Sequence, residues 1–142
     1  MIKYYFLKPE VAGGWGGNIV FERSPSLGTV VLKLHYIFED WLGDAIVKSS
    51  PCFIVTEAAA IEIQRNNLTG VTFDDVEVST SQQFKMFHSD IILPIFKWLK
   101  VVGEPGRDDF GLEGRTKLIV SQNAIDILNE LGLSHAIVQP LP

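Results

Sequence analysis

The sequence of 142 residues contains a single cysteine, Cys52, and no long apolar run. One cysteine permits neither an intrachain disulfide nor a metal site built from several thiolates. No stretch approaches the roughly 18 uncharged apolar residues of a membrane span, and the apolar run near the N-terminus is too short for a signal peptide. We therefore expect a cytoplasmic protein without a membrane partner, in which Cys52 is a buried hydrophobe.

Basic residues are also scarce. The chain has 12 Lys and Arg against 17 Asp and Glu, which gives a formal net charge of −5. Binding to nucleic acid depends on Lys and Arg placed against phosphates, so nucleic acid is not an expected partner. An acidic surface instead attracts a basic partner.

Motifs for catalysis and cofactor binding are missing as well. The glycine-rich stretch 13–18 lacks the lysine and the spacing of a phosphate-binding loop, and no nucleophile elbow is present. His35, His88 and His135 show no HxH or HxxxH spacing that would place two of them on one metal ion. We expect no cofactor, no metal and no catalytic residue, and we interpret the histidines as surface or hydrogen-bonded side chains.

Hydrophobic residues make up 46% of the chain, enough for the core of one domain covering residues 1–142. The pattern from Pro51 to Val78 predicts a strand–helix–strand unit. An apolar strand runs into Thr56, whose hydroxyl can cap a helix. The helix ends at Asn66-Asn67, and alternating apolar residues predict one strand over 71–78.

The same pattern recurs in the C-terminal part of the chain, where Leu118–Ser121 corresponds to Phe53–Thr56. A helix with apolar residues at helical spacing and a strand over 136–138 follow. The recurrence has two explanations, a true duplication or repeated use of a common local solution. We predict an α+β fold with a mixed β-sheet, about three helices, about six or seven strands and two strand–helix–strand units, within which part of the sheet is parallel.

Several charged segments are candidates for partner binding. Asp40 can act as a helix cap, which predicts a short helix over 41–48. That helix would carry Trp41 and Asp44. Two acidic stretches with few positive residues between them could form one acidic patch; they contain Asp74, Asp75, Glu77, Asp108, Asp109 and Glu113. Such a patch would attract a cationic protein or bind a divalent ion, whereas solvated charge is the simpler interpretation.

Eight phrases, spread in order over nearly the whole chain, carry a resemblance to a known family. They include the sequences PEVAGG, WLGD, PCFIVT and FDDVEV. The phrases lie within Tyr4–Gly14, Leu34–Tyr36, Trp41–Asp44, Pro51–Thr56, Leu68–Gly70, Phe73–Val78, Trp98–Val101 and Asp108–Gly111. Together they resemble the immunity proteins of bacterial polymorphic toxin systems. The chain departs from that pattern at Trp15 and at Glu39-Asp40, which affects local loop shape.

The resemblance implies a protein that binds and neutralises a cognate bacterial toxin and is not an enzyme. Such an interface combines aromatic anchors with acidic residues that pair with the toxin's cations. The expected contact residues are Trp41, Asp44, Asp74, Asp75, Glu77, Asp108 and Asp109. One alternative is a small hydrolase or metal-dependent enzyme, in which these carboxylates and a histidine would converge on one point. A structural assembly subunit is another.

Overall fold

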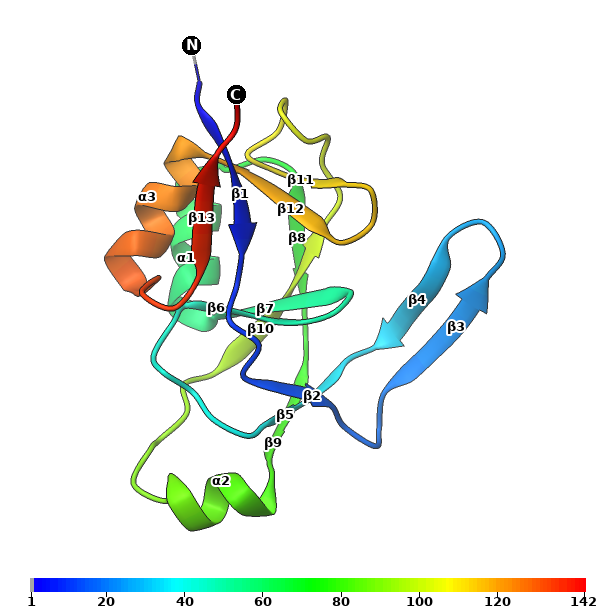
Figure 1. Cartoon of the computed structure of the whole chain (residues 1–142), viewed down its shortest axis with the longest axis vertical. Helices are drawn as coiled ribbons and strands as arrows, with labels where there is room; N and C mark the ends of the chain where they lie inside the picture. The colour runs from blue at the N-terminus through cyan, green and yellow to red at the C-terminus, as the bar shows by residue number, and fades with distance from the viewer. Residues whose placement is uncertain (1) are drawn as a thin grey trace.

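Two four-stranded sheets, each carrying one helix, form one end of the molecule (Figure 1). The structure is a computed structural model that describes residues 2–142. The first sheet has the order β6 (Ile46–Ser49), β7 (Cys52–Thr56), β10 (Phe96–Val101), β8 (Val71–Asp74), and α1 (Glu57–Arg65) joins β7 to β8. The second has the order β11 (Phe110–Glu113), β12 (Lys117–Ser121), β1 (Tyr4–Lys8), β13 (Ile137–Pro140), and α3 (Gln122–Leu131) joins β12 to β13.

The two sheets share one topology and one register. Leu99 lies opposite Phe53 in the first sheet, and Leu7 lies opposite Leu118 in the second. The buried residues of α1 and α3 also follow their caps at the same spacing; they are Ala59, Ala60 and Ile63 in α1 and Ala124, Ile125 and Leu128 in α3. The predicted pair of units is therefore present, and both contribute to one hydrophobic core.

The middle strand of each sheet comes from outside its unit. β10 lies antiparallel between β7 and β8, and β1 lies antiparallel between β12 and β13. The predicted parallel pairing therefore does not occur inside either unit, and it is found instead between β5 (His35–Phe38) and β9 (Glu77–Thr80). The two strands of a unit do run in the same direction, but a strand distant in sequence separates them.

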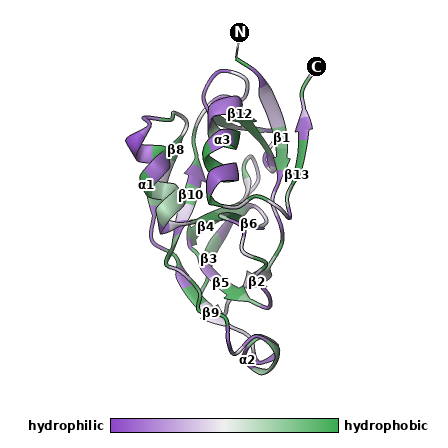
Figure 2. Cartoon of the chain, turned by 90° about the vertical axis from the view of Figure 1, so that its left-hand side faces the viewer, coloured by the Kyte–Doolittle hydropathy of each residue, from purple (hydrophilic) through white to green (hydrophobic). Residues whose placement is uncertain are grey.

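Helix capping follows the sequence prediction. The Thr56 hydroxyl accepts a hydrogen bond from the Ala59 amide at 3.2 Å, and the Ser121 hydroxyl accepts one from the Ala124 amide at 3.2 Å. Figure 2 shows hydrophilic residues on the outer side of α3 and apolar ones toward the sheets. Burial of that apolar face, rather than intrinsic propensity, stabilises helices of this length.

The other end of the molecule is built on a three-stranded sheet and a short helix. The sheet has the order β2 (Gly13–Trp15), β5 (His35–Phe38), β9 (Glu77–Thr80), and β5 and β9 are parallel. α2 (Gln82–Phe87) begins after its cap, Ser81. Phe84 is buried and anchors this helix, whereas Phe87 is 69% exposed.

Among the described residues there are 13 strands in four sheets and three helices, so the α+β class is confirmed but the predicted strand number was too low. The predicted strand over 71–78 is divided at Asp75 and Val76 into β8 and β9, which join different sheets. The predicted helix over 41–48 was also wrong. β-Branched Ile46 and Val47 enter β6, which pairs with β7 as a hairpin.

A hairpin of β3 (Val20–Ser24) and β4 (Gly28–Lys33) projects from the body, and we call it the arm (Figure 1). Its strands pair only with each other. At its base, the Trp15 and Phe21 rings lie 5.2 Å apart. Gly28 has a φ of +71° in the turn at the tip, a backbone conformation that favours glycine.

We expect Thr56→Ala to lower the free energy of unfolding by about 1 kcal/mol, because the change removes the acceptor for a helix amide. Ser121→Ala should lower it by about 2 kcal/mol or more, because the Ser121 hydroxyl also donates a hydrogen bond to Asp109 Oδ1 at 2.6 Å. Chemical denaturation measures this difference. Gln83→Ala, an exposed change outside both units, is the control. Loss of less than a few tenths of a kcal/mol in both cap variants would contradict the capping role.

Candidate functional site

Asp44 and Asp109 connect the two units reciprocally. Asp44 accepts hydrogen bonds from the Ser134 amide (Oδ1, 3.0 Å) and the His135 amide (Oδ2, 2.9 Å). Asp109 precedes the second unit as Asp44 precedes the first, and it accepts a hydrogen bond from the Thr69 amide (Oδ2, 2.9 Å). Thr69 follows α1 at the position that Ser134 occupies after α3. Each carboxylate thus binds the segment that follows the helix of the other unit.

These bonds give both aspartates a structural role. Asp44 is 1% exposed, and its Oδ1 also lies 3.1 Å from His135 Nδ1. Asp109 Oδ1 additionally accepts a hydrogen bond from the Ser121 hydroxyl at 2.6 Å. Although the sequence predicts both residues as partner contacts, Asp44 has no surface to offer and the carboxylate of Asp109 is held by groups of the protein itself.

Trp41 and Asp108 are also tied into the fold. The Trp41 indole donates a hydrogen bond to the Asp44 carbonyl at 3.0 Å, and its ring lies edge-on to Phe96 with 5.9 Å between ring centres. Asp108 accepts a hydrogen bond from the Glu104 amide at 2.7 Å and so closes the turn before β11. Both side chains are half-buried.

Asp74, Asp75 and Glu77 lie at the surface, in and beside the turn between β8 and β9. Each carboxylate is within 3.2 Å of a lysine Nζ; the pairs are Asp74–Lys100, Asp75–Lys97 and Glu77–Lys33. The expectation of an acidic patch with few positive residues was therefore wrong here. The lysines come from β10 and β4, which are distant in sequence.

Hydrogen bonds shift the ionisation of two of these carboxylates. The Asp75 amide and then Lys100 lower the pKa of Asp74, and the Asn18 side-chain amide and then Lys33 lower the pKa of Glu77. Both groups are thus held as anions at neutral pH. The Asp75 side chain is 92% exposed, which leaves it the most accessible of the three.

The two acidic stretches do not meet. Asp109 binds Thr69 before β8, whereas Asp74 ends β8, and the five residue steps from Thr69 to Asp74 span about 16 Å of extended chain. Within residues 2–142, no group of three His, Cys, Asp or Glu side chains is placed to hold a metal ion. The convergence of carboxylates on which the hydrolase hypothesis depends is absent from the described chain.

A histidine–hydroxyl pair that the sequence did not indicate lies beside Glu77. His35 Nε2 is 2.6 Å from the Ser79 hydroxyl and 3.7 Å from Glu77 Oε2. The Asn18 amide donates to His35 Nδ1 at 3.1 Å, so that nitrogen carries no proton. The ring proton is therefore on Nε2, and His35 donates to Ser79 rather than accepting its proton. This geometry is structural and does not activate Ser79 as a nucleophile.

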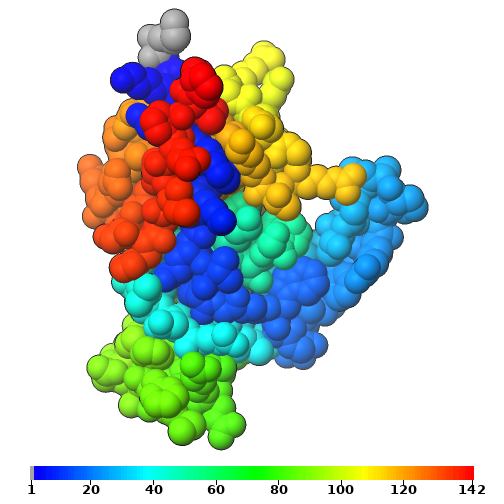
Figure 3. Space-filling model, in the orientation of Figure 1, coloured from blue at the N-terminus to red at the C-terminus, as the bar shows by residue number. Residues whose placement is uncertain are grey.

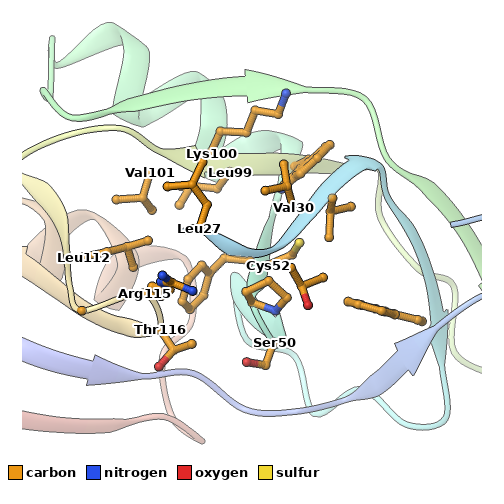
Figure 4. Close-up of a pocket in the computed structure, with 17 residues that line it drawn as sticks. Leu27, Val30, Ser50, Cys52, Leu99, Lys100, Val101, Leu112, Arg115 and Thr116 are labelled. Atoms are coloured by element: carbon orange, nitrogen blue, oxygen red, sulfur yellow. The ribbon is translucent and has the colours of Figure 1, made fainter. Parts of the chain in front are cut away.

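A hollow lies between the arm and the body, and we call it the arm groove (Figure 4). Its volume is about 710 Å³, within the range of ligand sites. One wall is the middle of β4, and the facing wall comes from the first sheet and the β11–β12 turn. The apolar side chains that line it include Val30, Cys52, Leu99, Val101 and Leu112.

The arm also carries exposed apolar side chains. Leu27 is 64% exposed, Leu32 52% and Val20 48%. Exposed apolar side chains that gather on one projecting element are typical of interaction surfaces. A separate exposed apolar group, around α2, contains Met86 and Phe87.

The charge of the arm groove differs from that of the whole chain. Its lining contains Lys100 and Arg115 but no Asp or Glu, although the net charge of the protein is −5. Lys100 is paired with Asp74. Arg115 donates to the Ser26 carbonyl at the tip of the arm and has no carboxylate within 4.0 Å among the described residues.

No protein-family model and no curated protein matches this chain. Within the described residues, no helix combines the length and the apolar character needed to cross a membrane.

We expect Asp44→Ala to lower the free energy of unfolding by about 3 kcal/mol, because two amides lose a charged acceptor in a buried place. Asp75→Ala, at an exposed position, should change it by less than about 1 kcal/mol. Urea denaturation of both variants measures the difference. Equal effects of the two substitutions would show that the Asp44 hydrogen bonds do not stabilise the contact between the units.

Cys52 should react slowly with thiol reagents in the folded protein. The side chain is 5% exposed, and burial raises the pKa of its thiol to about 12. The thiolate is the reactive form, so labelling at pH 8 should be at least about a hundredfold slower than in 6 M guanidinium. A chromogenic disulfide reagent measures both rates, and similar rates would contradict the buried position.

Proposed function

We propose that this protein is a cytoplasmic binding protein of the immunity type, which neutralises a cognate bacterial toxin by covering it. The observation that carries the proposal is the arm, a projecting hairpin with exposed apolar side chains beside an open groove. Supporting it are the phrases from Tyr4 to Gly111 that resemble such immunity proteins.

The toxin contact is proposed on the face shared by the arm and the β8–β9 turn. Leu32 and Lys33 of β4 line a hollow of about 390 Å³ together with Asp74, Asp75 and Glu77. Apolar and acidic side chains therefore alternate over a short distance. Such a surface supplies an apolar centre from which water is excluded and a polar rim that orients the partner.

A basic toxin is the favoured partner. The net charge of −5 raises the rate of encounter with a cationic protein, an effect that salt weakens. The lysines beside Asp74, Asp75 and Glu77 make the local field weaker than the carboxylates alone would give. We therefore assign most of the affinity to apolar contact and the long-range attraction to the charge of the whole protein.

Co-expression with each toxin candidate encoded beside the gene tests the proposal. We expect co-purification and a dissociation constant below 1 μM with one of them, together with loss of that toxin's activity. Binding weaker than micromolar to every adjacent candidate would contradict the proposal.

The double variant Leu27→Ser/Leu32→Ser tests whether the toxin binds at the arm. Both side chains are more than half exposed, so the fold should tolerate the changes. We expect binding to weaken by at least about tenfold, because apolar anchors at an interface centre contribute on the order of 1.4 kcal/mol or more in total. Met86→Ser/Phe87→Ser, at equally exposed positions near α2, is the matched control and should bind like the wild type.

A further inference from the structure

The edge of β4 that faces away from β3 is open. β4 pairs with β3 along one edge, and in the described chain no backbone hydrogen bond outside the hairpin reaches residues 29–33. An unpaired strand edge presents a row of N–H and C=O groups that can pair with an added strand.

This edge borders the arm groove. The groove is lined by Thr29, Val30 and Val31 of β4, but by no residue of β3. β4 also lies on the body side of the arm in Figure 1. The facing wall contributes Val101 and Leu112, both partly exposed, so a chain added to β4 would have apolar side chains on its far side.

The groove is a passage rather than a closed cavity. Figure 3 shows an opening between the arm and the body, bounded near the tip of the arm by the gold-coloured part of the chain. There Arg115 donates to the Ser26 carbonyl and lies against Gly28. This is one exposed hydrogen bond, which contributes little net stability, whereas Val31 packs against the buried cluster that contains Tyr36 and Trp98. The tip is therefore the more weakly held end of the arm.

The charges of the side chains that line the passage indicate what kind of segment would bind there. The lining has no carboxylate, and Arg115 has no carboxylate partner among the described residues. A guanidinium group binds a carboxylate with two parallel hydrogen bonds. An acidic side chain on the bound segment would supply that partner.

We infer that an extended segment of the toxin, with apolar side chains and one acidic residue, binds inside the arm groove. It adds as a strand to the edge of β4 that faces the body. The acidic residue pairs with Arg115, and the apolar residues face Val101 and Leu112. This inference rests on the proposed function. A polypeptide fits better than a small molecule because only a polypeptide satisfies a row of backbone groups along an open passage.

Charge variants of Arg115 test the acidic contact. Measured against the toxin identified by co-purification, Arg115→Gln should weaken binding about tenfold and Arg115→Glu by more. Arg107→Gln, an exposed arginine whose guanidinium is 3.4 Å from Glu104, is the matched control and should leave binding unchanged. The effect of Arg115→Gln should also shrink as salt is raised from 50 to 500 mM.

Amide hydrogen exchange of the full-length protein, free and bound to the toxin, tests strand addition directly. Strand pairing uses alternate residues of an edge, so we expect new protection at every second amide of residues 29–33. Protection confined to other surfaces, or unchanged affinity of Arg115→Glu, would overturn this inference while leaving the proposed function intact. Failure of the wild-type protein to bind any adjacent toxin would overturn both.

Discussion

The reciprocal hydrogen bonds of Asp44 and Asp109 are the constraint on which the rest of the fold depends. A buried carboxylate is costly unless donors surround it, and Asp44 meets two backbone amides and the His135 ring. These bonds can form only when each unit lies against the segment that follows the helix of the other. They therefore fix the relative position of the two units, and with it the packing of α1 against α3 in one core.

The arm stands outside this arrangement. A two-stranded hairpin is marginal by itself, and this one is held at its base by Trp15 against Phe21 and at its tip by Arg115. Among the described residues, no strand of the four-stranded sheets pairs with β3 or β4, so side chains rather than a backbone ladder join the arm to the body. Val31 is one of them, and it packs against the buried cluster that contains Tyr36 and Trp98.

Sequence reasoning found the caps Thr56 and Ser121 because capping acts over three residues. It assigned Asp44 and Asp109 to the surface because a charged residue is usually exposed, and their amide partners lie 90 and 40 residues away. The ion pair of Asp75 was not predicted for the same reason, because its lysine partner is 22 residues away. The arm groove was also missed, since the Arg115 to Ser26 contact spans 89 residues.

The sequence by itself determined the α+β class, the two strand–helix–strand units, their caps and the burial of Cys52, because each follows from local periodicity or from the apolar character of a short run. Only the tertiary structure decided which strand fills the middle of each sheet, which lysines pair with Asp74, Asp75 and Glu77, and where the arm leaves an open edge. Strand pairing and ion pairing join residues far apart in the chain, and the free energy that selects among the alternatives comes from burying the whole core at once.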